Sequence, residues 1–145
     1  MFDIEKSIAF LLAKNHQRAF RIFREKLFAF GITPPQFATL AFLWKNNILN
    51  QVELGKLMEV DRNTLSGIID RLEDAGLVQR VHDPNDRRAW NLMLTQKGKE
   101  KQKDLIPIAL EVNSFLVENL TLEEKELLLT LLIKIRKNKI SEKAY

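Results

Sequence analysis

The sequence predicts a mainly α-helical protein that carries one small β-hairpin. Three observations support this fold class. Apolar residues recur at helical spacing over most of the 145 residues, the period becomes extended only near residues 77–95, and a turn-forming run divides that stretch in two. We therefore expect a single domain over residues 1–145, in which a hairpin is inserted between helices.

A long helix is expected at the N-terminus, because residues 2–30 contain neither Pro nor Gly and Gly31 then interrupts the pattern. Its expected apolar stripe is Leu12, Phe20, Phe23 and Leu27. Thr33 has the residue type of an N-cap for a second helix, and Pro34 and Pro35 are tolerated in that helix's first turn. The expected buried stripe of the second helix is Phe37, Leu40, Ala41 and Trp44.

Two short helices joined by a tight turn are expected next. Asn50 and Glu53 have the spacing of a capping box, and the inward residues of the first short helix are expected to be Leu54, Leu57 and Met58. Residues 59–61 form the turn, where Asp61 can accept a hydrogen bond from the Thr64 N–H. The second short helix ends at Gly76, and its inward residues are expected to be Leu65, Ile68, Ile69 and Leu72.

The hairpin is expected from residues 77–82 and 89–95, with Trp90, Leu92 and Leu94 on one face. The intervening residues 83–88 are turn-forming and end in Arg87 and Arg88, which we expect at the tip. Thr95 is then expected to cap a helix that runs to about Asn119 with a kink at Pro107. Thr121 and Glu124 form another capping box, for a final helix to about Asn138 that is followed by a short polar tail.

The composition narrows the function classes. The net charge of +4 and the pI near 9.4 favour a polyanionic partner. The chain has no cysteine, which excludes disulfides, thiolate metal sites and cysteine nucleophiles. It shows no signal peptide and no apolar run of about 18 residues, so we expect a cytoplasmic protein without a membrane partner.

An enzyme is not expected, because the sequence has neither a Gly-rich phosphate loop nor a nucleophile elbow. The two histidines, His16 and His82, fall on separate elements. We therefore expect no catalytic residues, no metal site and no cofactor.

Two short helices joined by a three-residue turn and followed directly by a hairpin describe a winged helix-turn-helix, whose second helix enters the major groove of double-stranded DNA. The outer face and N-terminal end of that helix present the candidate DNA-binding residues Arg62, Asn63, Thr64, Ser66, Gly67 and Arg71. The segment from Asp61 to Ala75 is net acidic, so only its N-terminal half is expected to approach the groove. Arg87 and Arg88 of the wing are expected in the minor groove, with Asp86 orienting one of them.

The wing segment from Asp83 to Thr95 (DPNDRRAWNLMLT), followed by Gly98, resembles the wing signature of the MarR family of bacterial and archaeal regulators. Residues 72–78 and 33–37 are similar to that family's flanking patterns. The resemblance implies a winged helix-turn-helix lobe over residues 33–95 and dimerisation helices over residues 1–30 and 96–138. It also implies a homodimer that binds a pseudo-palindromic operator, usually as a repressor, and that a small aromatic or anionic ligand releases from DNA.

Carried onto this sequence, the family's recognition positions are Arg62, Asn63, Thr64, Ser66 and Gly67, and its wing-tip residue is Arg87. Close relatives often have arginine where this chain has Gly67. We therefore expect fewer contacts to base edges in the major groove here, or contacts that are made by Arg62 and Arg71 instead. The absence of cysteine places the chain outside the family's peroxide-sensing branch.

The terminal helices carry more apolar residues than one buried face requires. In the last helix these are Leu127, Leu128, Leu129, Leu131, Leu132, Ile133 and Ile135, and residues 8–13 show the same excess. We expect both helices to pack against their twofold mates; the alternative is burial within one chain.

A ligand pocket beside these helices is one interpretation, because His16 is a polar group on the apolar face of the first helix. Its expected lining is Leu12, His16, Phe20, Phe37, Leu40 and Trp44. The interpretation that we favour is that His16 is a hydrogen-bonded core or interface histidine and that the other residues are ordinary core. Two other functions stay open as well: a ligand-independent architectural DNA binder and a winged-helix protein–protein adaptor.

Overall fold

The computed structural model describes residues 1–138, so the polar tail expected after Asn138 lies outside the described residues. The chain divides into two compact units, Met1–Val112 and Asn113–Tyr145. Within the described residues, no helix is long and apolar enough to cross a bilayer.

The first helix, α1 (Ile8–Phe28), is shorter than the expected helix over residues 2–30. The short 3₁₀ helix η1 (Ile4–Lys6) precedes it, and Ser7 separates the two with extended backbone angles and a side chain that accepts from the Phe10 N–H. A serine can cap a helix locally, and this competes with continuing the helix through it. Of the expected apolar stripe, Leu27 is buried and Phe23 half-buried, whereas Leu12 and Phe20 are exposed.

The second helix, α2 (Pro34–Asn46), begins with the expected cap at Thr33. Thr33 and Gln36 form a full capping box there. Leu40 is completely buried, while Phe37, Ala41 and Trp44 are half-buried. The Trp44 Nε1–H donates to the Gly98 carbonyl at 3.0 Å, which ties this helix to the segment that follows the hairpin.

The helix-turn-helix consists of α3 (Gln51–Met58) and α4 (Arg62–Asp74), and both begin at the expected caps. Glu59 ends α3 in the left-handed conformation, and Gly76 follows α4 with a φ of 70°. The four expected inward residues of α4 are all buried. The expected inward position of Leu57 is wrong, because α3 meets the core through Leu54 and Met58 on one face and Leu57 is 40% exposed outside it.

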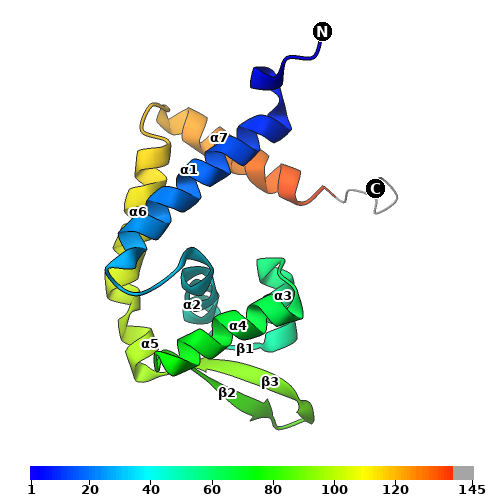
Figure 1. Cartoon of the computed structure of the whole chain (residues 1–145), viewed down its shortest axis with the longest axis vertical. Coiled ribbons are helices and arrows are strands. Elements are labelled where there is room, and N and C mark those ends of the chain that lie inside the picture. Colours follow the sequence, from blue (N-terminus) through cyan, green and yellow to red (C-terminus); the bar gives the residue numbers. More distant parts are fainter. Residues whose placement is uncertain (139–145) are drawn as a thin grey trace. The chain divides into compact units, whose positions relative to one another are not determined.

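The sheet has three antiparallel strands in the order β1-β3-β2, one more than the expected hairpin. The additional strand, β1 (Ile48–Asn50), pairs with the end of β3, so that Leu49 lies opposite Leu92. β2 (Val78–Asp83) and β3 (Asp86–Leu94) form the hairpin, whose turn is clear of the helices in Figure 1.

The hairpin turn is shorter than expected, because Asp83 already pairs with Asp86. Arg87 and Arg88 therefore lie in β3 beside the turn and not at the tip itself. Leu92 and Leu94 face the core as expected, while Trp90 is 39% exposed. The Trp90 ring stacks on His82, with the ring centroids 3.9 Å apart.

The helix expected over residues 95–119 is two helices, α5 (Gln96–Glu100) and α6 (Gln102–Leu116). The interruption lies at Lys101, whose carbonyl accepts from the N–H groups of both Asp104 and Leu105. Pro107 lies inside α6, so the expected kink site is not where the helix divides. In the second unit, α7 (Leu122–Arg136) begins with the expected capping box of Thr121 and Glu124.

Candidate DNA interface

The first turn of α4 presents an exposed polar surface. Arg62, Asn63 and Thr64 are all exposed, because the apolar residues of α4 face the core. Asp61 Oδ1 accepts from the Thr64 N–H at 2.8 Å, and its Oδ2 accepts from the Thr64 hydroxyl at 2.7 Å. These two hydrogen bonds, the side-chain one first, lower the pKa of Asp61 below its usual value.

Further along α4, the predicted DNA-contact residues lie on two different sides of the helix. Gly67 and Arg71 are exposed, and a Cβ atom at Gly67 would meet nothing within 4 Å. Ser66 is half-buried, and its hydroxyl and carbonyl oxygens both accept from Arg80. The structure therefore places Ser66 against the wing, on a different side of α4 from the open surface at Gly67.

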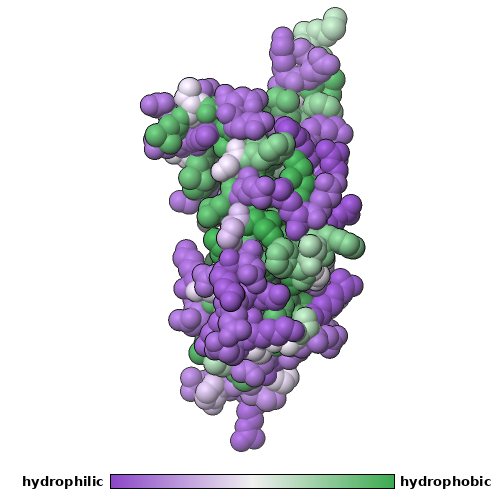
Figure 2. Space-filling model, turned by 90° about the vertical axis from the view of Figure 1, so that its left-hand side faces the viewer, coloured by the Kyte–Doolittle hydropathy of each residue, from purple (hydrophilic) through white to green (hydrophobic). Residues whose placement is uncertain are grey.

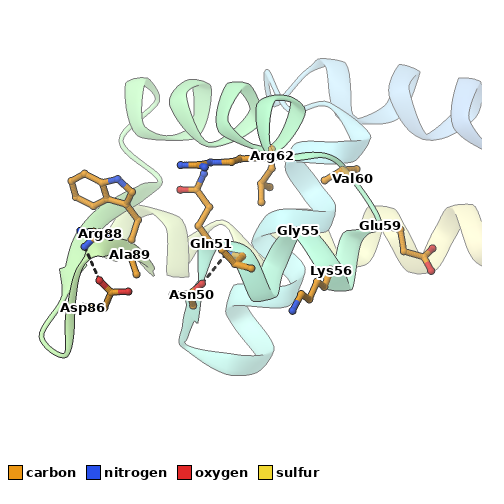
Figure 3. A pocket seen from close by; sticks show the side chains of 13 residues that line it. Asn50, Gln51, Gly55, Lys56, Glu59, Val60, Arg62, Asp86, Arg88 and Ala89 are labelled. Atoms are coloured by element: carbon orange, nitrogen blue, oxygen red, sulfur yellow. Dashed lines mark hydrogen bonds between the residues drawn. The ribbon is translucent and has the colours of Figure 1, made fainter.

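On the wing, Arg87 and Arg88 are both exposed. The Arg88 backbone N–H donates to Asp86 Oδ1 at 2.9 Å, and Figure 3 draws this bond. Asp86 thus orders the backbone of the strand at Arg88, whereas the expected contact was with an arginine side chain.

A cleft of about 700 Å³ lies between α3, the start of α4 and strand β3 (Figure 3). We call it the wing cleft. Arg62 lies at the α4 side, Arg88 on the wing and Lys56 on α3, while Glu59 and Asp86 are the acidic residues of its lining. Two of the predicted DNA contacts, one from the recognition helix and one from the wing, therefore line the same cleft.

A second cleft, of about 510 Å³, lies between α1, the start of α2 and α4. We call it the helix cleft, and its lining contains no Asp or Glu. Arg24 of α1 and Arg71 of α4 supply its charge. The other lining residues are Phe20, Thr33, Pro34, Pro35, Gln36, Asn63, Thr64, Gly67 and Ile68.

The six residues predicted to form a ligand pocket are distributed differently. Leu12 and His16 are exposed on α1, where the His16 ring lies 5.8 Å from that of Phe20. Phe37 packs edge-on against Phe23 and Trp44, and Leu40 belongs to the core. Of the six, Phe20 alone lines the helix cleft, and none lines the wing cleft.

Arg80 of β2 is a residue that the sequence reasoning did not single out. Its side chain is only 14% exposed and forms salt bridges with Asp70, at 2.7 Å, and with Glu73. No sequence motif marks it, because Asp70 and Glu73 meet Arg80 only when β2 packs against α4. Within residues 1–138, no group of three His, Asp or Glu side chains is arranged to hold a metal ion.

Comparisons with known proteins agree with this geometry. Residues 32–90 match the model of the MarR family. The chain is 34% identical over 134 residues to the HTH-type transcriptional repressor NicR of Pseudomonas putida, covering 92% of this chain and 85% of that protein. A mutant of MarR from E. coli, solved in complex with operator DNA, has a TM-score of 0.82 at 30% identity, over 88% of this chain and 92% of that one.

A third relative is BpsR of Bordetella bronchiseptica, from a structure that describes how 6-hydroxynicotinic acid regulates its DNA binding. It has a TM-score of 0.90 at 26% identity and covers 96% of this chain and 99% of that one.

Proposed function

The chain belongs to the MarR family of transcriptional regulators, and from that premise we propose that it is a repressor that binds a pseudo-palindromic operator as a homodimer. The observation that carries the proposal is the wing cleft, which Arg62 of the recognition helix and Arg88 of the wing both line. A duplex lying across this face would meet α4 in its major groove and Arg87 in the adjacent minor groove. Figure 2 shows the left-hand side of Figure 1, which is mostly hydrophilic over its lower part, where the winged lobe lies.

The terminal helices support the homodimer. No residue of α7 is buried within the described chain, and its apolar side chains from Leu127 to Ile135 are 36–62% exposed. On α1, Ile8 and Leu11 are 71% and 44% exposed. Exposing this many apolar side chains on one helix to water is unfavourable, and a second copy of the chain would cover them.

The effector is proposed to be a small aromatic carboxylate. BpsR responds to such an acid, and the helix cleft of this chain offers two arginines, a phenylalanine and two prolines with no opposing carboxylate. Asn63, Thr64 and Gly67 of the recognition helix line the same cleft. A ligand bound there releases the repressor only if it prefers the arrangement that cannot bind DNA.

DNA binding is tested with a duplex selected from a random library by the wild-type protein, compared with a scrambled duplex of equal composition. Arg87→Ala should weaken binding to both duplexes and reduce the slope of log K against log salt by about one unit. Arg21→Ala removes an exposed arginine of α1 as a matched control and should leave the slope unchanged. An unaltered slope for Arg87→Ala would exclude a phosphate contact by the wing.

The effector is tested by adding 6-hydroxynicotinic acid to the preformed complex with the selected duplex. Release is expected for the wild type and for Arg21→Gln, and it should require at least about tenfold more ligand for Arg24→Gln, which loses a charge-assisted contact. His16→Ala tests the pocket first expected on α1. If His16→Ala loses the response while Arg24→Gln keeps it, the ligand site lies around His16 and not in the helix cleft.

Two other functions remain as outcomes of these experiments. An architectural DNA binder would bind the selected and scrambled duplexes equally and would ignore aromatic acids. A protein–protein adaptor would bind neither duplex at physiological salt.

A further inference from the structure

Arg80 lies between the recognition helix and the wing, and all of its side-chain nitrogens are used. Nη1 contacts the carboxylates of Asp70 and Glu73, and Nε donates to Gln51 Oε1 at 3.4 Å. Nη2 donates to the carbonyl and hydroxyl oxygens of Ser66, at 3.2 and 3.3 Å. The Arg80 backbone N–H adds a bond of 3.2 Å to Glu73 Oε2.

These partners belong to different parts of the winged lobe. Gln51 opens α3, whereas Ser66, Asp70 and Glu73 follow one side of α4. Arg80 itself lies in β2, which pairs with the strand that carries Arg87 and Arg88. One side chain thus connects the helix-turn-helix to the wing.

The pattern requires arginine in particular. A planar guanidinium presents five N–H groups in a rigid fork and can serve a carbonyl, a hydroxyl and two carboxylates at once. A lysine would keep the charge, but its single ammonium group has three N–H donors at one point and cannot bond to partners spread around Nε, Nη1 and Nη2. Charge and geometry at this position can therefore be separated by experiment.

The carboxylates that Arg80 holds are relevant to DNA. Asp70 lies two helical turns beyond Asn63 on the same face of α4, and its side chain is 61% exposed. The same carboxylate without a counter-charge would repel phosphates that approach the recognition helix.

We propose that Arg80 is a positioning residue for DNA reading. It fixes the position of the recognition helix relative to the wing, and its positive charge reduces the repulsion between the carboxylates of Asp70 and Glu73 and the DNA phosphates. Arg80 itself does not contact DNA. The proposal rests on the DNA-binding function proposed above, because it concerns the geometry with which that same face reads a sequence.

The geometry is tested with Arg80→Lys, using the selected and scrambled duplexes. We expect binding to the selected duplex to weaken by about tenfold or more, and binding to the scrambled duplex to stay within about twofold. The salt slope should equal that of the wild type, because no phosphate contact is lost. Arg21→Lys is the matched control and should change neither affinity.

The screening is tested with Arg80→Met, alone and combined with Asp70→Asn and Glu73→Gln. Arg80→Met should weaken binding to both duplexes, since two carboxylates are left without their counter-charge. The triple variant should recover binding to the scrambled duplex but not the preference for the selected one. Thermal unfolding of each variant reports whether the lobe is folded. If Arg80→Met does not fold, the proposal is tested by the binding measurements on Arg80→Lys.

The proposal is overturned if Arg80→Lys keeps the wild-type preference for the selected duplex. It is also overturned if the salt slope of the triple variant, which lacks the Arg80 charge, falls by about one unit, because that would indicate a direct phosphate contact. A wild-type protein that does not prefer any duplex overturns the proposed function, and the role of Arg80 with it. A wild type that discriminates, together with an Arg80→Lys variant that discriminates equally, overturns the role of Arg80 alone.

Discussion

At the scale of single residues, the winged lobe is held by contacts between groups that are distant in the chain. Gly98 lies so close to the end of α4 that a Cβ atom there would be 2.0 Å from the Leu77 carbonyl oxygen. Thr95 and Lys97 reach the same region, donating to the carbonyls of Gly76 and Ala75 at 2.6 and 2.9 Å. The C-terminal end of the recognition helix is thereby fastened to α5.

Gly98→Ala should therefore destabilise the protein by about 1–3 kcal/mol or more, as overpacking against backbone does. Gly67→Ala is the matched control, because an added Cβ meets nothing within 4 Å there, and in a helix it should stabilise by about 0.5–1 kcal/mol. Urea unfolding of both variants measures the difference. Equal effects of the two substitutions would show that α5 does not press on the end of α4.

Asp61 gives a pH-dependent prediction. Its hydrogen bonds with Thr64 lower its pKa in the folded state below the ordinary value of 3.8. The stabilisation is therefore present above that value and is lost as the pH falls through the folded pKa. Asp61→Ala should unfold at a lower temperature than the wild type at pH 7, and the difference should shrink below about pH 4. A difference that is constant from pH 7 to pH 2.5 would rule out the charged cap.

At the scale of elements, the residues that predicted helix starts were reliable, because a cap is local. Thr33, Asn50, Asp61 and Thr121 all cap helices as their types and spacing indicated. Strand β1 was not predictable, since three residues between two helices show no period and pair only with a strand more than forty residues away. The interruption between α5 and α6 at Lys101 could not be predicted either, because the residue there is neither Pro nor Gly.

The candidate site was predictable to the same extent. The exposed face of α4 follows from its helical period, so Arg62, Asn63 and Gly67 could be assigned to it. The positions of Ser66 and Arg80 depend on how the wing packs against α4, and no local pattern records that contact. The helix cleft was missed because it is formed by three helices and its two arginines are 47 positions apart (71 − 24).

The third strand can be tested as an element. Leu49 faces the core at 9% exposure, while its neighbour Ile48 is 50% exposed in the same strand. Leu49→Ala should cost about 2–5 kcal/mol of unfolding free energy, and Ile48→Ala should cost much less. If the two substitutions cost the same in urea unfolding, β1 is not packed on the core.

At the scale of the whole molecule, the proposed operator binding requires a second copy of the chain. Leu129→Glu and Leu132→Glu would place charges on exposed apolar positions of α7 without opening a core, since these side chains are 62% and 41% exposed in the single chain. The double variant should sediment as a monomer at micromolar concentration, where we expect the wild type to sediment as a dimer. The thermal unfolding of the double variant, followed by its helical signal, should remain cooperative, because the winged lobe stays folded. A wild-type monomer would contradict the dimer directly.

The central claim is that two winged lobes read one duplex together. Hydroxyl-radical footprinting on the selected duplex tests this most directly. We predict two protected segments centred about 10–10.5 base pairs apart or a multiple of that spacing, each flanked by a minor-groove protection that Arg87→Ala removes. A single protected segment, or protection that is the same along a scrambled duplex, would contradict the claim.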